Sequence, residues 1–500
     1  MTSARIIIDP AFTVAPVNRR TFGTFVEHMG RCVYTGIYEP GHATADEDGF
    51  RKDVLELTRE LGVSVVRYPG GNFVSGYRWE DGVGPREGRP RRLDLAWHSV
   101  ETNEFGLDEF IRWCAKAGVE PMMALNLGTR GVQEALDLQE YSNHRGGTAL
   151  SDLREQHGAS PYGIKLWCLG NELDGPWQVG HKTPTEYGRL AAETARAMRM
   201  IEPDLELVAC GSSSSAMPLF GTWEQTVLRE TYDFVEYISC HAYYGNDDGD
   251  TASFLASAVN MDRFIESVVA TADHIGAELK SRKKIGISFD EWNVWYRDRS
   301  RRTDGPGDQW EVAPRRIEDE YNVTDAVVVG NLLISLLRHS DRVGVACLAQ
   351  LANVIAPIMT EPGGPAWRQP TFHPFAITSR LAAGQVLQVR TNSPTVSTTK
   401  HGEVPAVDAV ATYDEGRLTV FAVNRSTEGP IEATIDVSRA GVTTVDEAVL
   451  IHDADPLATN SATQPDRVTP QPLESAQLAD GKLTITLPAI SWTALSLSTD

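Results

Sequence analysis

Cysteine is scarce in this 500-residue sequence, and the six cysteines are widely spaced. They form no CxxC pair and no cluster with histidine, so the spacings typical of a zinc site are absent. Most of the cysteines lie inside apolar runs, where a free thiol behaves as a small hydrophobic side chain. We therefore expect buried, reduced thiols and no metal.

The sequence also lacks a long hydrophobic run. Its longest apolar helix candidate, Ala326–Leu337, is well short of the roughly 20 residues that cross a membrane, and Gly330 and Asn331 interrupt it. The apolar run within the first ten residues is too short for a signal peptide. These absences predict a cytoplasmic protein with no membrane partner.

Positive charge is in deficit. The chain carries 46 Lys and Arg against 68 Asp and Glu, a net charge of −22, which disfavours nucleic acid and anionic membranes as partners. A neutral sugar suits this balance, although many soluble enzymes share it. The length exceeds one ordinary domain, and a hydrophobic fraction of 41% is enough for a sizeable core. We expect a large catalytic domain and a smaller second one.

From about residue 20 to 385, short apolar strands alternate with amphipathic helices. The expected strands are Thr21–His28, Val63–Tyr68, Pro121–Leu127, Ile164–Glu172, Leu205–Gly211, Val235–Tyr244, Lys284–Trp295 and Val343–Asn353. The helical patterns include Asp48–Leu61, Leu107–Ala117, Thr185–Ile201, Ala252–Ala277 and Asn322–His339. Eight strand–helix repeats predict an α/β fold, a (β/α)8 TIM barrel. An open doubly wound sheet is the alternative, but no GxGxxG follows the first strand.

Beyond about residue 387 the pattern changes to alternating strands separated by turns. These strands are Val404–Tyr413, Arg417–Asn424, Ile431–Val437, Glu447–His452 and Lys482–Leu497. They predict a C-terminal antiparallel β-sandwich, jelly-roll-like, over residues 386–500, after a catalytic barrel over residues 18–385. A strand-like run at Arg5–Val14 precedes the barrel, so we expect residues 1–17 to join the sandwich.

Two glutamates, Glu172 and Glu291, each end an apolar run that is typical of a buried strand. A carboxylate in such a place is costly unless it faces a cleft where it is hydrated or hydrogen-bonded. Either acid alone is better interpreted as part of a structural ion pair. Together they suit glycoside hydrolysis, in which one acid protonates the leaving oxygen and the other attacks the anomeric carbon or activates water.

Polar or aromatic side chains also end most of the other predicted strands. They are Glu27, His28, Arg67, Asn72, Asn126, Asn171, His241, Tyr243, Trp295, Gln350 and Asn353. The active site of a barrel lies at the carboxyl ends of its strands, so these side chains are expected to meet at one mouth. Their hydrogen-bonding groups, charges and rings suit a polar site of saccharide size.

Several of these strand ends resemble a known family. The runs Phe25–His28, Gly36–Pro40, Val66–Phe73, Trp167–Glu172, Asp290–Trp295 and Ala349–Pro357 resemble family 51 glycoside hydrolases, and in particular the intracellular bacterial α-L-arabinofuranosidases. The resemblance covers nearly the whole chain, more loosely in the tail. Gly-Asn-Glu alone is shared by many barrel glycosidases, but the combination is specific.

The resemblance implies a retaining, exo-acting α-L-arabinofuranosidase that removes terminal arabinofuranose from arabinan or arabinoxylan oligosaccharides. It makes Glu172 the general acid/base and Glu291 the nucleophile. It implies no cofactor and a homo-oligomer, a hexamer. For the remaining residues it implies orientation of the nucleophile by Arg67 and Tyr243 and a subsite wall at Trp295. It also implies contacts with sugar from Asn171, Glu27, Asn72, Tyr243, Gln350 and His241. Without the resemblance, Asn171 is equally well a turn residue, Arg67 an ion-pair partner and His241 a structural histidine.

A retaining mechanism sets the distance between the two acids. Their carboxyl groups should lie about 5–5.5 Å apart, against roughly 6.5–9.5 Å in an inverting enzyme. We expect Arg67 to keep Glu291 ionised, and Glu172 to have the higher pKa of the two.

Three tryptophans lie outside the strand ends. Trp97 and Trp177 are candidates for stacking on neighbouring sugars or for packing. Trp310 lies in the insertion at residues 298–316, which is either a solvated loop or a cover for the mouth.

Other enzyme classes make different demands on the sequence. A β-xylosidase or an endo-β-glucanase is the nearest alternative on the same barrel. A metal-dependent sugar isomerase needs a cluster of acids and histidines around an ion, and an aldolase needs a strand-end lysine, which no predicted strand has. A non-catalytic sugar-binding protein does not need both Glu172 and Glu291.

Overall fold

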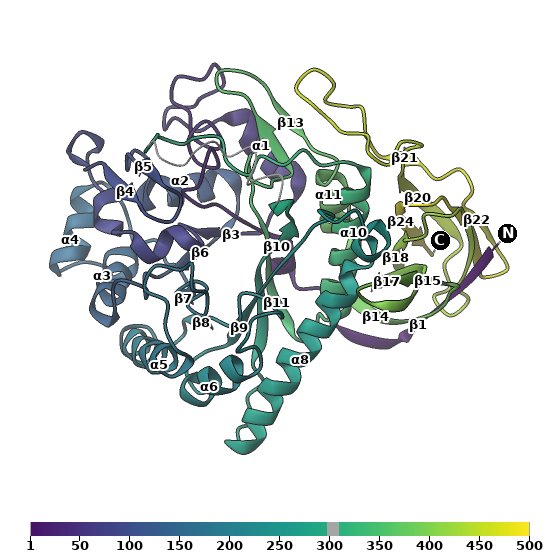
Figure 1. Cartoon of the computed structure of the whole chain (residues 1–500), viewed down its shortest axis with the longest axis horizontal. Coiled ribbons are helices and arrows are strands. Elements are labelled where there is room, and N and C mark those ends of the chain that lie inside the picture. Colours follow the sequence, from purple (N-terminus) through teal and green to yellow (C-terminus); the bar gives the residue numbers. More distant parts are fainter. Residues whose placement is uncertain (1, 298–309, 500) are drawn as a thin grey trace.

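The computed structural model describes residues 2–297 and 310–499. Eight parallel strands close into a barrel in the order β10-β11-β2-β3-β6-β7-β8-β9 (Figure 1). These strands are β2 (Gly23–Phe25), β3 (Val65–Tyr68), β6 (Glu120–Ala124), β7 (Leu166–Leu169), β8 (Glu206–Ala209), β9 (Tyr237–Tyr244), β10 (Gly286–Val294) and β11 (Val343–Ala349). All eight predicted strands take their places in it, so the predicted TIM barrel is confirmed.

Helices surround the barrel. They are α1 (Lys52–Leu61), α2 (Leu107–Ala117), α3 (Val132–Asn143), α4 (Ala149–Gln156), α5 (Pro184–Ile201), α6 (Thr222–Thr231), α7 (Thr251–Leu255), α8 (Ser257–Glu278), α10 (Val323–Arg338) and α11 (Phe372–Leu381). In α1 the apolar side is buried, and Gly62 ends the helix with a left-handed φ of 76°. The single helix predicted at Ala252–Ala277 is wrong, because the backbone of Ala256 leaves the helical conformation and separates α7 from α8.

The second unit is a curled ten-stranded sheet in the order β21-β20-β24-β18-β17-β14-β1-β19-β23-β22. Its strands are β1 (Thr2–Pro16), β14 (Gln385–Asn392), β17 (Val407–Asp414), β18 (Arg417–Asn424), β19 (Ile431–Asp436), β20 (Thr444–Ile451), β21 (Gln471–Pro472), β22 (Gln477–Ala479), β23 (Lys482–Leu487) and β24 (Ser491–Ser498). The predicted sandwich is confirmed, and β1 lies within its sheet. The boundaries 18–385 and 386–500 stay a prediction.

Two details of this sheet differ from the prediction. β1 pairs antiparallel with β14 but parallel with β19, because no hairpin connects it to β19 and fixes the strand direction. The predicted strand Lys482–Leu497 is two strands, β23 and β24. Pro488, which has no N–H, and Ile490, with a φ of 47°, lie between them.

Helix α10 lies between the barrel and the curled sheet (Figure 1). Buried charges fix this junction: Asp408 of β17 accepts hydrogen bonds from Arg338 of α10 and from Arg425, and one from Asn331 at 2.8 Å. Burial raises the pKa of Asp408, but the two arginines outweigh it and lower the pKa below its usual value.

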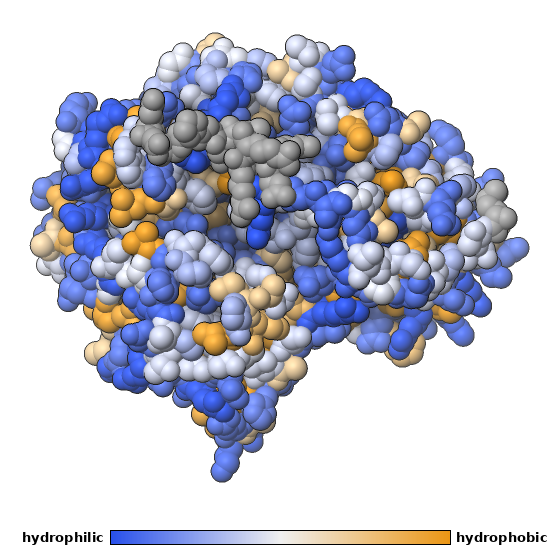
Figure 2. All heavy atoms as spheres, viewed as in Figure 1, coloured by the Kyte–Doolittle hydropathy of each residue, from blue (hydrophilic) through white to orange (hydrophobic). Residues whose placement is uncertain are grey.

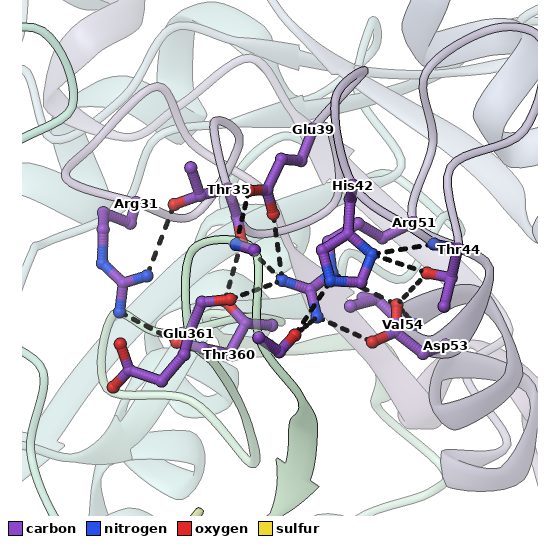
Figure 3. Close-up of polar contacts among 12 residues, drawn as sticks. Arg31, Thr35, Glu39, His42, Thr44, Arg51, Asp53, Val54, Thr360 and Glu361 are labelled. Atoms are coloured by element: carbon purple, nitrogen blue, oxygen red, sulfur yellow. Dashed lines mark hydrogen bonds and ion pairs between the residues drawn. The ribbon is translucent and has the colours of Figure 1, made fainter.

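Figure 3 shows a second cluster, centred on the fully buried Arg51. Its guanidinium donates to Asp53 at 2.7 Å and to Glu39 at 3.1 Å, and also to the carbonyl oxygens of Glu361 and Gly364 at 3.0 and 2.8 Å. These bonds join the long connection after β2 to the hairpin of β12 (Ile358–Thr360) and β13 (Ala366–Arg368), which follows β11. Both connections supply residues to the mouth of the barrel.

The surface is mainly hydrophilic on the face drawn in Figure 2, with small, separate apolar patches. Among the helices of the described ranges, none has both the length and the hydrophobicity to cross a membrane.

Candidate active site

A bulge in β10 brings two consecutive acids to the mouth of the barrel. The pairing of β10 shifts register between Ser288 and Glu291 against β9, and between Phe289 and Trp292 against β11. In a regular strand neighbouring side chains point to opposite faces, but a bulge breaks this alternation. Asp290 and Glu291 therefore contact the same two residues, Arg67 and His241.

Glu291 is buried and has a hydrogen-bond donor on each carboxylate oxygen. Arg67 Nη1 donates to Oε1 at 2.7 Å, and the Tyr243 hydroxyl donates to Oε2 at 2.8 Å. Burial raises the pKa of Glu291, with a further contribution from Glu172, against the lowering effect of His241 and Arg67. Burial is the largest effect and leaves this pKa above its ordinary value, although Arg67 lowers it as expected.

Glu172 faces Glu291 from the turn after β7. Its φ of 41° is unusual for a residue with a side chain, and such strain is typical of functional sites. Its Oε2 accepts from the indole Nε1 of Trp177 at 2.7 Å, and its Oε1 lies 2.9 Å from His241 Nδ1. A carboxylate oxygen of Glu172 lies within 4.8 Å of one of Glu291.

His241 connects three acids. Besides Glu172, its Nδ1 lies 3.5 Å from Glu291, and its Nε2 lies 2.9 Å from Asp290. Burial lowers the pKa of His241, but the surrounding carboxylates overcome this effect and raise it to about 10. Asp290 was missed as a site residue, since strand alternation places it on the opposite face from Glu291. The adjacency of two acids at the end of an apolar run was the available signal.

The raised pKa of His241 predicts a pH dependence of stability. The folded pKa of about 10 exceeds the ordinary value of 6.5, so the ion pairs stabilise the fold fully below pH 6.5 and lose this effect as the pH rises towards 10. The free energy of unfolding should fall across this window by on the order of 1 kcal/mol per pH unit. Urea unfolding of the wild type and of His241→Gln at pH 6 to 10 measures it. Equal slopes for the two proteins would contradict the assignment.

Glu27, at the end of β2, lies on the other side of the site. Its Oε1 accepts from the backbone N–H of Phe73 and from Trp97 Nε1, both at 2.9 Å, and its Oε2 accepts from Gln350 Nε2 at 3.0 Å. Burial, with the charge of Glu291, raises the pKa of Glu27 to about 8. Trp97 and Trp177 thus each donate to an acid of the site.

Two side-chain amides of the site each have a buried polar atom without a hydrogen-bond partner within the part of the chain that the structure describes. Asn171 accepts from Arg67 Nη2 at 2.7 Å, which leaves its Nδ2 without an acceptor. Gln350 donates to Glu27, which leaves its Oε1 without a donor. A buried polar group left unpaired is costly, so one free donor and one free acceptor here favour a polar ligand.

The turn after β3 lies close to both acids of the mouth. A Cβ atom at Gly71 would lie 3.0 Å from Glu291 Oε1 and 3.3 Å from Glu27 Oε2, so a side chain at this position would crowd both carboxylates. Asn72 follows and is half-buried. Trp295 is also half-buried, and its ring meets that of Tyr243 edge-on at 5.3 Å.

Three of the strand-end residues lie outside this group. The ring nitrogens of His28 form hydrogen bonds with Glu101 and Tyr68. The Asn126 side chain donates a hydrogen bond to Thr129 in the following turn. The Asn353 side chain donates to the Arg31 carbonyl and to the Thr360 hydroxyl. These are structural contacts.

The insertion at residues 298–316 is only partly described, because residues 298–309 lie outside the described ranges. Trp310 stacks on His98 at 5.2 Å, and the Glu311 carbonyl accepts from the backbone N–H of Val100. The end of the insertion therefore docks on the hairpin that carries Trp97.

Ligand atoms of Glu172, His241 and Glu291 are close enough together to hold a metal ion. Both ring nitrogens of His241 already face carboxylates, and the Arg67 guanidinium bonds to Glu291. A fixed cation repels a second cation, so this donor set suits proton transfer better than metal binding.

The barrel and the paired acids at its mouth define a glycoside hydrolase. An alpha-L-arabinofuranosidase 1 domain matches residues 57–262, and the alpha-L-arabinofuranosidase C-terminal domain matches residues 290–491. The chain belongs to the α-L-arabinofuranosidases of glycoside hydrolase family 51.

Individual relatives are similar to this chain over nearly its full length. An intracellular exo-alpha-(1→5)-L-arabinofuranosidase of Streptomyces lividans is 62% identical over 99% of this chain and 75% of its own. An exo-alpha-(1→6)-L-arabinofuranosidase of Bifidobacterium longum is 56% identical over 99% of this chain and 97% of its own. The structure of AbfB, a family 51 alpha-L-arabinofuranosidase from Bifidobacterium longum, has a TM-score of 0.95 at 51% identity and covers 99% of this chain and 100% of its own.

Proposed function

We propose that the protein is a retaining, exo-acting α-L-arabinofuranosidase that releases terminal L-arabinofuranose from oligosaccharides derived from arabinan and arabinoxylan. One observation carries the mechanism: oxygens of Glu172 and Glu291 approach within 4.8 Å. This separation suits direct attack on the sugar and leaves too little room for the water of an inverting enzyme.

In the first step Glu291 attacks the anomeric carbon while Glu172 protonates the leaving oxygen, so the glycosidic bond breaks as a glycosyl–enzyme bond forms. Arg67 and Tyr243 hold the Glu291 carboxylate for this attack. In the second step Glu172 accepts a proton from water, which attacks the anomeric carbon and frees Glu291.

The neighbouring groups suit a single furanose ring. The free Nδ2 of Asn171 is placed to donate to the sugar 2-hydroxyl, a contact that strengthens in the transition state. Glu27, Gln350, Asn72 and His241 supply further hydrogen-bonding groups. Trp295 adds an aromatic wall.

We further infer a cytoplasmic homo-oligomer, a hexamer by family resemblance, that needs no metal or organic cofactor. Its partners are arabinofuranosyl oligosaccharides, with no nucleic acid and no membrane. The catalytic unit is the barrel of residues 18–385, and the sandwich of residues 386–500, with strand 1–17, has a structural role.

A panel of aryl glycosides tests the proposal. The arabinofuranoside should be hydrolysed at least about 100-fold faster than the xyloside or glucoside, because the site is fitted to one ring. Activity should survive exhaustive EDTA treatment, since two carboxylates suffice for the chemistry. Faster cleavage of the xyloside or glucoside would favour the alternative glycosidases, and activity restored by divalent ions would favour a metal-dependent isomerase.

A further inference from the structure

A groove runs along the rim of the barrel mouth beside the catalytic acids. A hollow of about 610 Å³ lies between the segments around Gly76, Leu95, Arg130 and Val179. A second hollow of about 200 Å³ adjoins it, and Gly76, Arg78, Asp81 and Leu95 line both. We refer to the two hollows together as the rim groove. None of its lining residues belongs to the catalytic constellation described above.

The chain connects the rim groove to the leaving-group side of the site. Val179 follows two residues after Trp177, whose indole donates to Glu172. Leu95 precedes Trp97 by two residues, and the Trp97 indole donates to Glu27. Because Glu172 protonates the leaving oxygen, the sugars beyond the cleaved bond must leave the pocket on the side of Trp177. The segments that carry Trp177 and Trp97 continue into the lining of the rim groove.

Most of the charged side chains in the groove are paired with an opposite charge, and Asp94 accepts instead from the Ala96 N–H and the Ser99 hydroxyl. Arg130 bonds to both oxygens of Glu80 at 2.6 and 2.8 Å, and Arg92 bonds to Asp81 at 2.8 Å. Arg78 is exposed and has no side-chain hydrogen bond or ion pair with any described residue. A guanidinium carries five N–H donors in a fixed plane, so Arg78 offers free donors to the groove.

Apolar side chains face the same space. Leu95 and Leu93 are 56% and 59% exposed although both are large hydrophobic residues, and Val179 is half-buried. A furanose ring has a C–H face and a hydroxyl edge, so an exposed leucine beside a free guanidinium matches both sides of the sugar. A protein partner, in contrast, is expected to need a larger apolar patch than two leucines and one valine.

We propose that the rim groove binds the second and third sugars of the leaving group, so that the enzyme favours linear arabino-oligosaccharides of three or more residues over disaccharides. This inference rests on the proposed function. Arg78 donates to hydroxyls of the distal sugars, and Leu95 with Val179 packs against their C–H faces. These contacts contribute binding energy remote from the reacting bond.

Kinetics against chain length test the inference. We would measure kcat/KM for an aryl arabinofuranoside and for linear arabino-oligosaccharides of two to five residues, in the wild type, Arg78→Ala and Leu95→Ser. Arg282→Ala and Leu457→Ser are matched controls, since both are exposed residues away from the mouth. Both groove variants should keep the aryl and disaccharide rates within about twofold. They should lose roughly 10-fold on longer chains, mainly through KM, as expected for one lost charged hydrogen bond in Arg78→Ala and for lost apolar contact in Leu95→Ser.

Each result decides the question. If the wild type gains nothing from chain length, or if the groove variants lose equally on every substrate, the inference is wrong. If the controls lose the same chain-length preference, the groove is not its cause. A wild type inactive on the aryl arabinofuranoside would instead refute the proposed function, so the two failures are distinguishable.

Discussion

The Glu291→Gln variant should lose at least about 10⁴-fold of its kcat/KM towards an aryl α-L-arabinofuranoside, because an amide does not attack the anomeric carbon. Glutamine has the same shape and can still accept from Arg67, so the fold should persist. Steady-state kinetics and a thermal melt of the same preparation measure both effects.

The exposed Glu278 provides the control for this substitution. Glu278→Gln should keep the wild-type rate, since among the described residues its carboxylate pairs only with Arg229 and His274 on the outer helices. Retention of more than about a tenth of the activity by Glu291→Gln would contradict the nucleophile assignment. An initial product of inverted anomeric configuration from the wild type would contradict it as well.

The Glu172→Ala variant should show a different loss, one that depends on the leaving group. A phenol that leaves easily needs little protonation, so the first step should survive and give a burst of phenol. Deglycosylation then lacks its general base and should become slow. Added azide should restore turnover, because this small anion needs no base and fits the space that the carboxylate vacates.

Oligosaccharides have poor leaving groups and should lose roughly 10²–10⁴-fold in the same variant. Rapid-quench measurement of the burst, with and without azide, separates the two steps. If azide has no effect and good and poor leaving groups suffer equally, Glu172 has another role.

The sequence predicted the barrel well because each strand carries its own apolar run and the polar residues follow directly. The hydrophobic pattern did not predict where a helix or strand is interrupted, because one or two residues that break the backbone conformation hardly change the pattern. Ala256 looks helical in sequence yet separates α7 from α8, and Pro488 with Ile490 divides a run that alternates on both sides.

The candidate site shows the same limit. Its strand-end acids were predictable, but the bulge that turns Asp290 towards His241 depends on the pairing of β10 with both neighbours. In the sequence, His28, Asn126 and Asn353 could not be distinguished from the strand-end residues of the active site. Only their hydrogen-bond partners in the structure identify them as structural residues. The pKa of Glu291 likewise depends on burial, which the adjacency of an arginine does not reveal.

The place of β1 in the curled sheet has a consequence for biosynthesis. Residues 2–16 leave the ribosome first, but their partners are β14, at residues 385–392, and β19, at residues 431–436. The ribosome must therefore synthesise the whole barrel before β14 and β19 exist, and until then both edges of β1 have no strand to pair with. Closing a loop of this length is slow, and an unpaired strand invites pairing with other chains. Aggregation during translation should therefore begin at β1, and early folding of the barrel does not protect it.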